Sequence, residues 1–279
     1  MKKKMDQVIN IALIGIFFIG LSLLLYPVIS DWWNTSHQSH IIETYSKKVK
    51  NMNTGQYQKV LEEAATYNQN IAEHGIQWTM TADEFEKYNA LLNVADNGVM
   101  CYVEIPQIKC RLPVYHGTGE SVLQIAVGHI AGSSLPVGGT DTHCIISGHR
   151  GLPSAKLFSN IDKLQKGDHF MLHTLNETLT YEVDQIRIVL PNELEDLQII
   201  PGEDLCTLVT CTPYGVNTHR LLVRGHRVEN DKSTLINAEA IQIDQLIVAS
   251  IVAAVLLTGL FIWTVIISVR KKKKKGRHT

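Results

Sequence analysis

The chain has 279 residues, five cysteines and a formal net charge of −1, a length that fits one large domain or two small ones. Ten of its 26 Lys and Arg lie in the two tails, which leaves 16 against 26 Asp and Glu in residues 31–244, a formal balance of −10. This acidic middle argues against a nucleic-acid partner. The odd number of scattered cysteines does not suggest a disulfide framework, although a bridge between Cys101 and Cys110 stays open.

Two uncharged apolar runs, residues 8–30 and 246–269, are each long enough to cross a hydrocarbon core of about 30 Å. Basic residues precede the first run at Lys2–Lys4 and follow the second at Arg270–Lys275, so both termini are expected in the cytoplasm. A cleaved signal peptide is the alternative for the first run, but no small-residue cleavage site follows it. We therefore expect a two-pass membrane protein whose middle is extracellular.

The middle changes from a helical to a strand pattern near Gly98. Residues 37–75 have apolar side chains at helical spacing, and a short helix is expected over about 82–94, with Thr81 as N-cap and Glu84 completing a capping box. Short apolar runs with Gly and Pro punctuation follow, which indicates a mainly β fold, a barrel or sandwich. The strands are expected at Val99–Ile105, Cys110–Tyr115, Thr142–Ser147, His169–Thr174, Thr178–Leu190, Leu205–Thr210 and Leu221–Val223.

These patterns divide the chain into seven segments. They are a cytoplasmic N-terminus (1–7), a membrane-spanning signal anchor (8–30), an extracellular helical neck (31–97), a mainly β domain (98–230), a linker (231–245), a second membrane span (246–269) and a basic cytoplasmic tail (270–279).

Two candidate catalytic residues lie in a predicted hairpin. Its turn, Pro213–Asn217, separates Cys211 at the end of one strand from Arg220 at the start of the next. A thiol placed there can attack a carbonyl, and a guanidinium opposite can stabilise the negative charge that develops on the oxygen. This pattern predicts acyl transfer and requires a base.

Among the twelve histidines, His149 is the best candidate for that base, because it follows an apolar strand and is flanked by Gly148 and Gly151, which allow close approach. A zinc site is disfavoured: no C-x-x-C or H-E-x-x-H motif is present, and adjacent residues such as His143 and Cys144 point to opposite faces of a strand. No G-x-S-x-G motif marks a serine nucleophile. We therefore expect neither a metal nor a cofactor.

Several motifs in this region resemble those of the sortase family. Thr207–Cys211 reads Thr-Leu-Val-Thr-Cys and matches the sortase TLxTC signature, Ile146–Gly151 matches the histidine motif, and Asn217–Arg227 resembles the arginine strand. The likeness covers about residues 98–228 and is greatest to class C, the pilus-assembling sortases. The predicted neck and second membrane span agree with that class.

The resemblance implies a closed β-barrel and a cysteine transpeptidase that cuts a Leu-Pro-x-Thr-Gly-like sorting signal between Thr and Gly. Cys211 would be the nucleophile, His149 the general acid and then the base, and Arg220 the group that holds the substrate and offsets oxyanion charge. The incoming amine would be a lysine of the next pilin subunit. The sequence leaves open whether Cys211 and His149 form a lasting ion pair or stay mostly neutral.

Class C sortases usually carry a lid with an Asp-Pro-aromatic motif that plugs the active site. The nearest counterpart here, Asp83-Glu-Phe85, lacks the proline, and Trp78 in the preceding loop is a second candidate plug. In the alternative interpretation, Phe85 only packs the short helix on the barrel.

Three functions are compatible with the sequence. The first is a transpeptidase that polymerises pilins, and the second uses the same chemistry to attach single surface proteins to a peptidoglycan precursor. The third is a non-catalytic, membrane-anchored scaffold, which the intact set of Cys211, His149 and Arg220 disfavours.

Overall fold

The computed structural model describes residues 2–230, 252–259 and 261–264, and it divides into two units. One unit comprises residues 1–32 and 241–279, and the other comprises residues 33–240. The predicted linker 231–245, the ends of the second predicted span and the basic tail 270–279 lie outside the described residues.

The first unit is built on the apolar start of α1 (Lys2–Lys50), which is the only helix in the described part of the chain long and apolar enough to cross a membrane. Within the second predicted span, residues 252–259 and 261–264 are also helical. Phe17 of α1 stacks on Phe261 with ring centroids 4.3 Å apart, so this short helix contacts α1 inside the unit. Trp32 and Trp33 are exposed where the apolar part of α1 ends.

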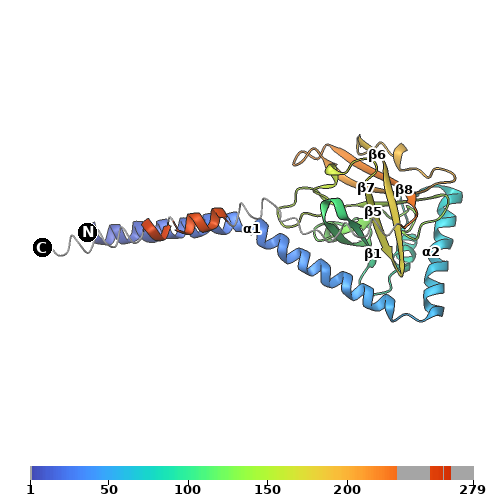
Figure 1. The fold of residues 1–279 in the computed structure, drawn as a ribbon, viewed down its shortest axis with the longest axis horizontal. Coiled ribbons are helices and arrows are strands. Elements are labelled where there is room, and N and C mark those ends of the chain that lie inside the picture. Colours follow the sequence, from blue (N-terminus) through green and yellow to red (C-terminus); the bar gives the residue numbers. More distant parts are fainter. Residues whose placement is uncertain (1, 231–251, 260, 265–279) are drawn as a thin grey trace. The chain divides into compact units, whose positions relative to one another are not determined.

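The second unit is a closed β-barrel with helices against its wall (Figure 1). Its strands pair in the order β1-β2-β3-β4-β7-β8-β6-β5, and β1 closes the ring by pairing with β5. The mainly β, closed-barrel prediction is confirmed. The elements are α2 (Thr54–His74), α3 (Ala82–Ala90), β1 (Val99–Ile105), η1 (Pro106–Ile108), β2 (Cys110–His116), α4 (Glu120–Leu123), β3 (Val127–His129), β4 (Thr142–Ser147), η2 (Ile161–Lys163), β5 (His169–Thr174), β6 (Glu177–Val189), η3 (Glu195–Leu197), β7 (Asp204–Thr212) and β8 (His219–Val228).

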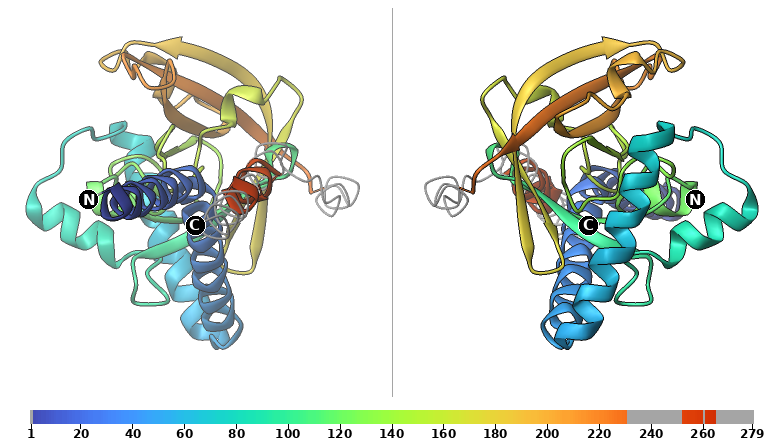
Figure 2. Two further views of the ribbon diagram at one scale, coloured as in Figure 1. Left: turned by 90° about the vertical axis from the view of Figure 1, so that its left-hand side faces the viewer. Right: turned by 90° about the vertical axis from the view of Figure 1, so that its right-hand side faces the viewer.

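Side chains that alternate along the strands fill the barrel. The interior includes Val103, Phe170, Tyr181, Leu208 and Val223, and the exposed fraction of each of these side chains is 0%. The longest strands, β6 and β8, run side by side over most of their length (Figure 2). This packed interior makes the wall that carries Cys211 a rigid support.

The neck is fastened to the barrel by buried hydrogen bonds. Tyr45 of α1 donates to the carbonyl of Met100 and accepts from the amide of Leu175, and the Asn68 side chain of α2 bonds both backbone groups of Leu135. Because these polar groups are buried, losing one partner would leave the other unsatisfied. The neck is therefore part of the folded unit.

Three details differ from the sequence prediction. The helix expected over 37–75 is interrupted at residues 51–53, because Asn53 caps α2 and forms a capping box with Gln56. The short helix does begin after Thr81, with the predicted capping box to Glu84, but it ends at Ala90. The strand β3 and the helix α4 were not predicted, since runs of three and four residues are too short to show a period.

Candidate active site

Cys211 and Arg220 lie directly opposite each other on neighbouring strands. The register of β7 against β8 pairs Thr210 with Leu221, Cys211 with Arg220 and Thr212 with His219. Side chains of directly opposite residues in an antiparallel pair share one face, with Cβ atoms about 5 Å apart. The guanidinium of Arg220 also donates to the carbonyls of Asn217 and His219, at 3.3 and 3.1 Å, which holds it at the turn.

His149 comes two residues after the last pair between the parallel strands β4 and β7, as Cys211 does. The last paired residues of β4 and β7 are Ser147 and Val209. Two hydrogen bonds continue the alignment past the last pair: the Gly148 amide donates to the carbonyl of Val209 at 3.0 Å, and the Thr210 hydroxyl donates to the carbonyl of Gly148 at 2.7 Å. The three predicted catalytic residues therefore come from adjacent strand ends.

The side chains of β7 alternate between two faces of the barrel wall. Leu208 packs in the barrel interior, whereas Val209 belongs to a separate, smaller apolar cluster on the other face. We call this group the outer cluster, and its buried members are Ile145, Val189, Leu197, Val209 and Leu222. Cys211 lies two residues after Val209 on β7, and Arg220 lies two residues before Leu222 on β8, so both side chains are on the face of the outer cluster. The thiol therefore lies at the edge of this cluster.

A loop before α3 covers the outer cluster. Ile76 and Trp78 pack against it, and the Gln77 amide between them donates to the carbonyl of Gly132 at 3.1 Å. Gly132 has φ +89°, and a Cβ there would lie 1.9 Å from the Gln77 carbonyl oxygen, so glycine is required for this approach. Of the three lid candidates, Trp78 is the one that this packing brings to the Cys211 face.

The other two lid candidates have different contacts. The Phe85 ring packs on Tyr88, with centroids 5.7 Å apart, and on the backbone of Gly117. Asp83 forms an ion pair with Lys87 of its own helix at 2.8 Å, and both side chains are exposed. These contacts favour the interpretation in which Phe85 packs the short helix on the barrel, and 41% of its side chain is exposed. A lid formed by Phe85 or Trp78 stays a prediction.

The remaining cysteines differ from Cys211 in exposure or in environment. All five are free, Cys101, Cys144 and Cys206 are buried, and Cys211 is partly exposed. Burial raises the pKa of the Cys110 thiol to about 12 and that of Cys101 and Cys144 well above the usual value, which keeps these thiols neutral. In the described residues no three His, Cys, Asp or Glu side chains lie together as metal ligands would.

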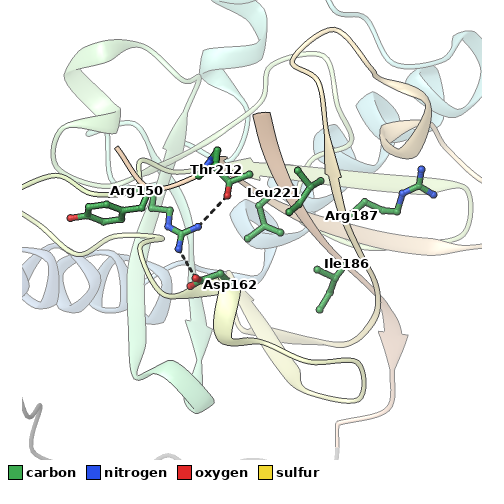
Figure 3. A pocket seen from close by; sticks show the side chains of 9 residues that line it. Arg150, Asp162, Ile186, Arg187, Thr212 and Leu221 are labelled. Carbon is green, nitrogen blue, oxygen red and sulfur yellow. Dashed lines mark hydrogen bonds and ion pairs between the residues drawn. The ribbon is translucent and has the colours of Figure 1, made fainter. Parts of the chain in front are cut away.

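Two neighbours of the predicted catalytic residues are visible only in the structure. The Glu120 carboxylate at the start of α4 lies 3.9 Å from Nε2 of His149. Arg150 lies beside a cavity of about 600 Å³, lined in part by Asp162, Thr212 and Leu221, and it bonds the first two (Figure 3). The sequence signal for Arg150 was its place next to His149, but nothing in the sequence showed its partners.

A closed barrel with a partly exposed thiol, a paired arginine and a histidine at adjacent strand ends defines a β-barrel protein with the layout of a cysteine acyl-transfer site. Residues 103–228 match the sortase domain. Sortase C1 of Streptococcus agalactiae is 55% identical and has a TM-score of 0.67, and the match covers 69% of this chain and 100% of that one. The chain belongs to the sortase family, a family of cysteine transpeptidases.

Other similar proteins are also sortases, at lower sequence identity. Sortase C of Streptococcus pneumoniae is 41% identical over 68% of this chain and 97% of that one, with a TM-score of 0.59. Sortase D of Bacillus subtilis is 30% identical over 45% of this chain, and sortase A of S. agalactiae is 31% identical over 39%. The matches to these two curated relatives span 62% and 45% of their own lengths. The predicted resemblance to class C sortases is confirmed.

Proposed function

We propose that this chain is a membrane-anchored transpeptidase that cleaves a Leu-Pro-x-Thr-Gly-like sorting signal between Thr and Gly and transfers the acyl group to a pilin lysine, polymerising surface pili. The observation that carries the proposal is the register that sets Cys211 opposite Arg220, with His149 just past the end of the adjacent strand β4. No cofactor is needed for this chemistry, since nucleophile, proton carrier and charge stabiliser are all side chains.

In the first half-reaction the Cys211 thiolate attacks the threonine carbonyl carbon. The carbonyl oxygen becomes an oxyanion, and Arg220 across the strand pair is the cation that offsets its charge. As the C–N bond breaks, protonated His149 gives its proton to the leaving glycine amine. The product is a thioester between Cys211 and the threonine.

In the second half-reaction the ε-amine of the acceptor lysine attacks the thioester carbonyl. His149, now neutral, accepts a proton from the attacking amine, and the Cys211 thiolate leaves as the amide forms. The product is an isopeptide bond, and the histidine is again protonated for the next cycle. One group serves as acid and base in turn, which fits a single histidine at the strand end.

The similar structures favour a pilin as the partner. Sortase C1 of S. agalactiae Pilus Island 1 is 38% identical, and the description of the S. pneumoniae sortase C concerns pilin substrate specificity. These properties belong to those proteins and support the same substrate class here. The alternative acceptor, a peptidoglycan precursor, requires the same Cys211 thioester and differs only in the second half-reaction.

The apolar part of α1 supports membrane anchoring. We infer a two-pass topology in which residues 246–269 form a second span, both termini are cytoplasmic and the barrel is extracellular. The basic residues at both ends of the sequence support this orientation. Trp32 and Trp33, exposed at the end of the apolar part of α1, suit the membrane–water interface.

The test uses the full-length protein in detergent micelles, a sorting-signal peptide and purified pilin. The expected result is a thioester on Cys211 in the peptide reaction, seen by mass spectrometry, and a covalent pilin ladder that Cys211→Ala abolishes. A thioester without a ladder, together with transfer to a peptidoglycan precursor, would replace pilin polymerisation by wall attachment. Absence of any thioester in the wild type would leave the non-catalytic, membrane-anchored scaffold as the remaining function.

A further inference from the structure

The guanidinium of Arg150 joins the chain segments that carry His149 and Cys211. It donates through Nη1 to the hydroxyl of Thr212 at 3.4 Å and pairs through Nη2 with the carboxylate of Asp162 in η2 (Figure 3). Arg150 directly follows His149, and Thr212 directly follows Cys211. One side chain therefore connects the immediate neighbours of the predicted acid–base group and the predicted nucleophile.

This contact lies on the opposite face from the reactive groups. Thr212 and Leu221 line the cavity beside Arg150, whereas Cys211 and Arg220 are the alternate residues that face the outer cluster. The Arg150 side chain is only 12% exposed, whereas its partner Asp162 is 39% exposed. The connection thus lies behind the face that carries Cys211 and Arg220.

The His149 carbonyl accepts from the amide of the buried Phe158 at 3.2 Å, but this bond does not join His149 to β7. Paired residues of β4 and β7 end at Ser147 and Val209, and the last tie between the segments before His149 is the bond from Thr210 to the Gly148 carbonyl. Beyond that point the chain leaves the sheet. Arg150 provides the next side-chain contact with β7, one residue past each reactive group.

The β7–β8 turn packs against the same segment. The Arg150 guanidinium lies 5.9 Å from the centroid of the Tyr214 ring, and a Cβ at Gly151, where φ is +80°, would come within 3.0 Å of that ring. The Gly151 amide donates to the Ser159 hydroxyl at 3.0 Å. Only a planar guanidinium can bond a carboxylate and a hydroxyl in one plane and lie over an aromatic ring, so lysine would not replace it fully.

One donor of the Arg150 guanidinium is left unsatisfied in the described part of the chain, which packing alone does not explain. Its Nε is buried and has no hydrogen-bond partner among the described residues. A buried, unsatisfied donor destabilises the folded state. An arginine held in this position against such a penalty fits a site where orientation matters more than stability.

We propose that Arg150, with Asp162 and Thr212 as its partners, is a positioning residue that holds His149 within reach of Cys211. The proposal rests on the transpeptidase function proposed above and adds a residue to it. In this role Arg150 acts through His149 and not on the substrate. Its loss should change the turnover of bound substrate and the influence of His149 on the thiol, and leave substrate binding nearly unchanged.

The test compares full-length Arg150→Gln and Arg150→Lys with Arg187→Gln as a matched control. Arg187 lines the same cavity but pairs with Asp196 at 3.6 Å, away from the Arg150 contacts. Two quantities are measured: kcat and KM for cleavage of a sorting-signal peptide, and the pH profile of Cys211 alkylation by iodoacetamide, located by mass spectrometry. His149→Ala supplies the profile of a thiol without its partner.

Arg150→Gln is expected to lower kcat roughly tenfold or more with KM within about twofold, because small misplacements of reacting groups are costly. Its alkylation profile should move toward that of His149→Ala, Arg150→Lys should lie between, and Arg187→Gln should match the wild type. A purely structural role would lower the melting temperature and leave the profile and the kcat per reactive thiol at wild-type values, and that result would overturn the proposal.

Two further controls keep the outcome decisive. If Arg150→Gln does not fold, Asp162→Asn weakens the same ion pair at a partly exposed position, and a wild-type profile in that variant would overturn the proposal. If the wild type cleaves no peptide, the proposed function fails. The alkylation profiles would still decide whether Arg150 places His149 beside Cys211, because alkylation requires no turnover.

Discussion

The two faces of the β7–β8 strand pair show how one pair of strands serves stability and chemistry separately. On the inner face Leu208 and Val223 are fully buried in the barrel core. On the outer face Val209 and Leu222 belong to a small cluster that ends at Cys211 and Arg220 and is covered by a loop. The core holds the strand ends in place, and the outer face presents the predicted reactive groups.

The largest contrast is expected between two cysteines of the same strand. Cys211→Ala should abolish thioester formation, because the outer face loses its nucleophile. Cys206→Ala changes the inner face, where the side chain is 0% exposed, and should keep activity while costing about 1 kcal/mol of unfolding free energy. Peptide cleavage assays and chemical denaturation measure the two effects. Equal loss of activity in both variants would contradict the division of the faces.

Two arginines of β8 extend the contrast along the outer face. Arg220→Lys should lower kcat roughly a hundredfold with little change in stability, because a point charge stabilises an oxyanion less well than a guanidinium fork. Arg224 forms a bidentate pair with Asp184 at 2.7 and 3.1 Å, and both are largely buried, so Arg224→Gln should cost about 3 kcal/mol of stability. If Arg224→Gln lowered kcat and Arg220→Lys lowered only stability, the cation that stabilises the oxyanion would lie elsewhere on β8 than at Arg220.

Much of the barrel followed from the sequence, because strand alternation and turn residues are local signals. The hairpin register of Cys211 against Arg220 followed from the turn Pro213–Asn217 between two apolar runs. His149 was predicted from its place after an apolar strand and beside glycines, but the pairing of its strand β4 with β7 was not, since parallel strands far apart in the chain show no mutual register in sequence.

What the sequence did not show depends on tertiary packing. The capping box of Thr81 and Glu84 predicted α3, but the direction of Phe85 depends on where Tyr88 anchors that helix. Tyr88 bonds Nδ1 of His129 at 2.8 Å, a residue of a strand too short to predict. The bonds of Arg150 likewise join segments 62 and 12 residues away along the chain.

Buried histidines fasten two coverings of the barrel and should make them acid-sensitive. His143 contacts the carbonyl of Gln198 in the β6–β7 loop and the hydroxyl of Thr207, and His129 contacts Tyr88 of α3. Burial lowers the pKa of each imidazole from 6.5 to about 4, so both are neutral in the folded protein.

The sign of the pH effect follows from these lowered pKa values. Between pH 6.5 and about 4 the unfolded chain binds protons that the folded chain does not, so stability present above pH 6.5 is lost as the pH falls, by about 3 kcal/mol for each histidine. Urea unfolding across this range measures the loss. The unfolding free energy of His143→Gln should depend less steeply on pH, by the contribution of about one proton. An unchanged slope would mean that His143 is protonated in the fold.

The smallest expected effect concerns the covering of the outer face, and it tests whether that face is gated. Trp78 packs on the outer cluster at whose edge Cys211 lies, whereas Phe85 packs on Tyr88 and Gly117. Trp78→Ala should therefore raise the rate of Cys211 labelling by a thiol reagent several-fold. Phe85→Ala, an aromatic truncation of similar size in the adjacent helix, should leave the rate unchanged. If neither variant changes the rate, the loop does not act as a lid; if only Phe85→Ala raises it, α3 covers the thiol instead.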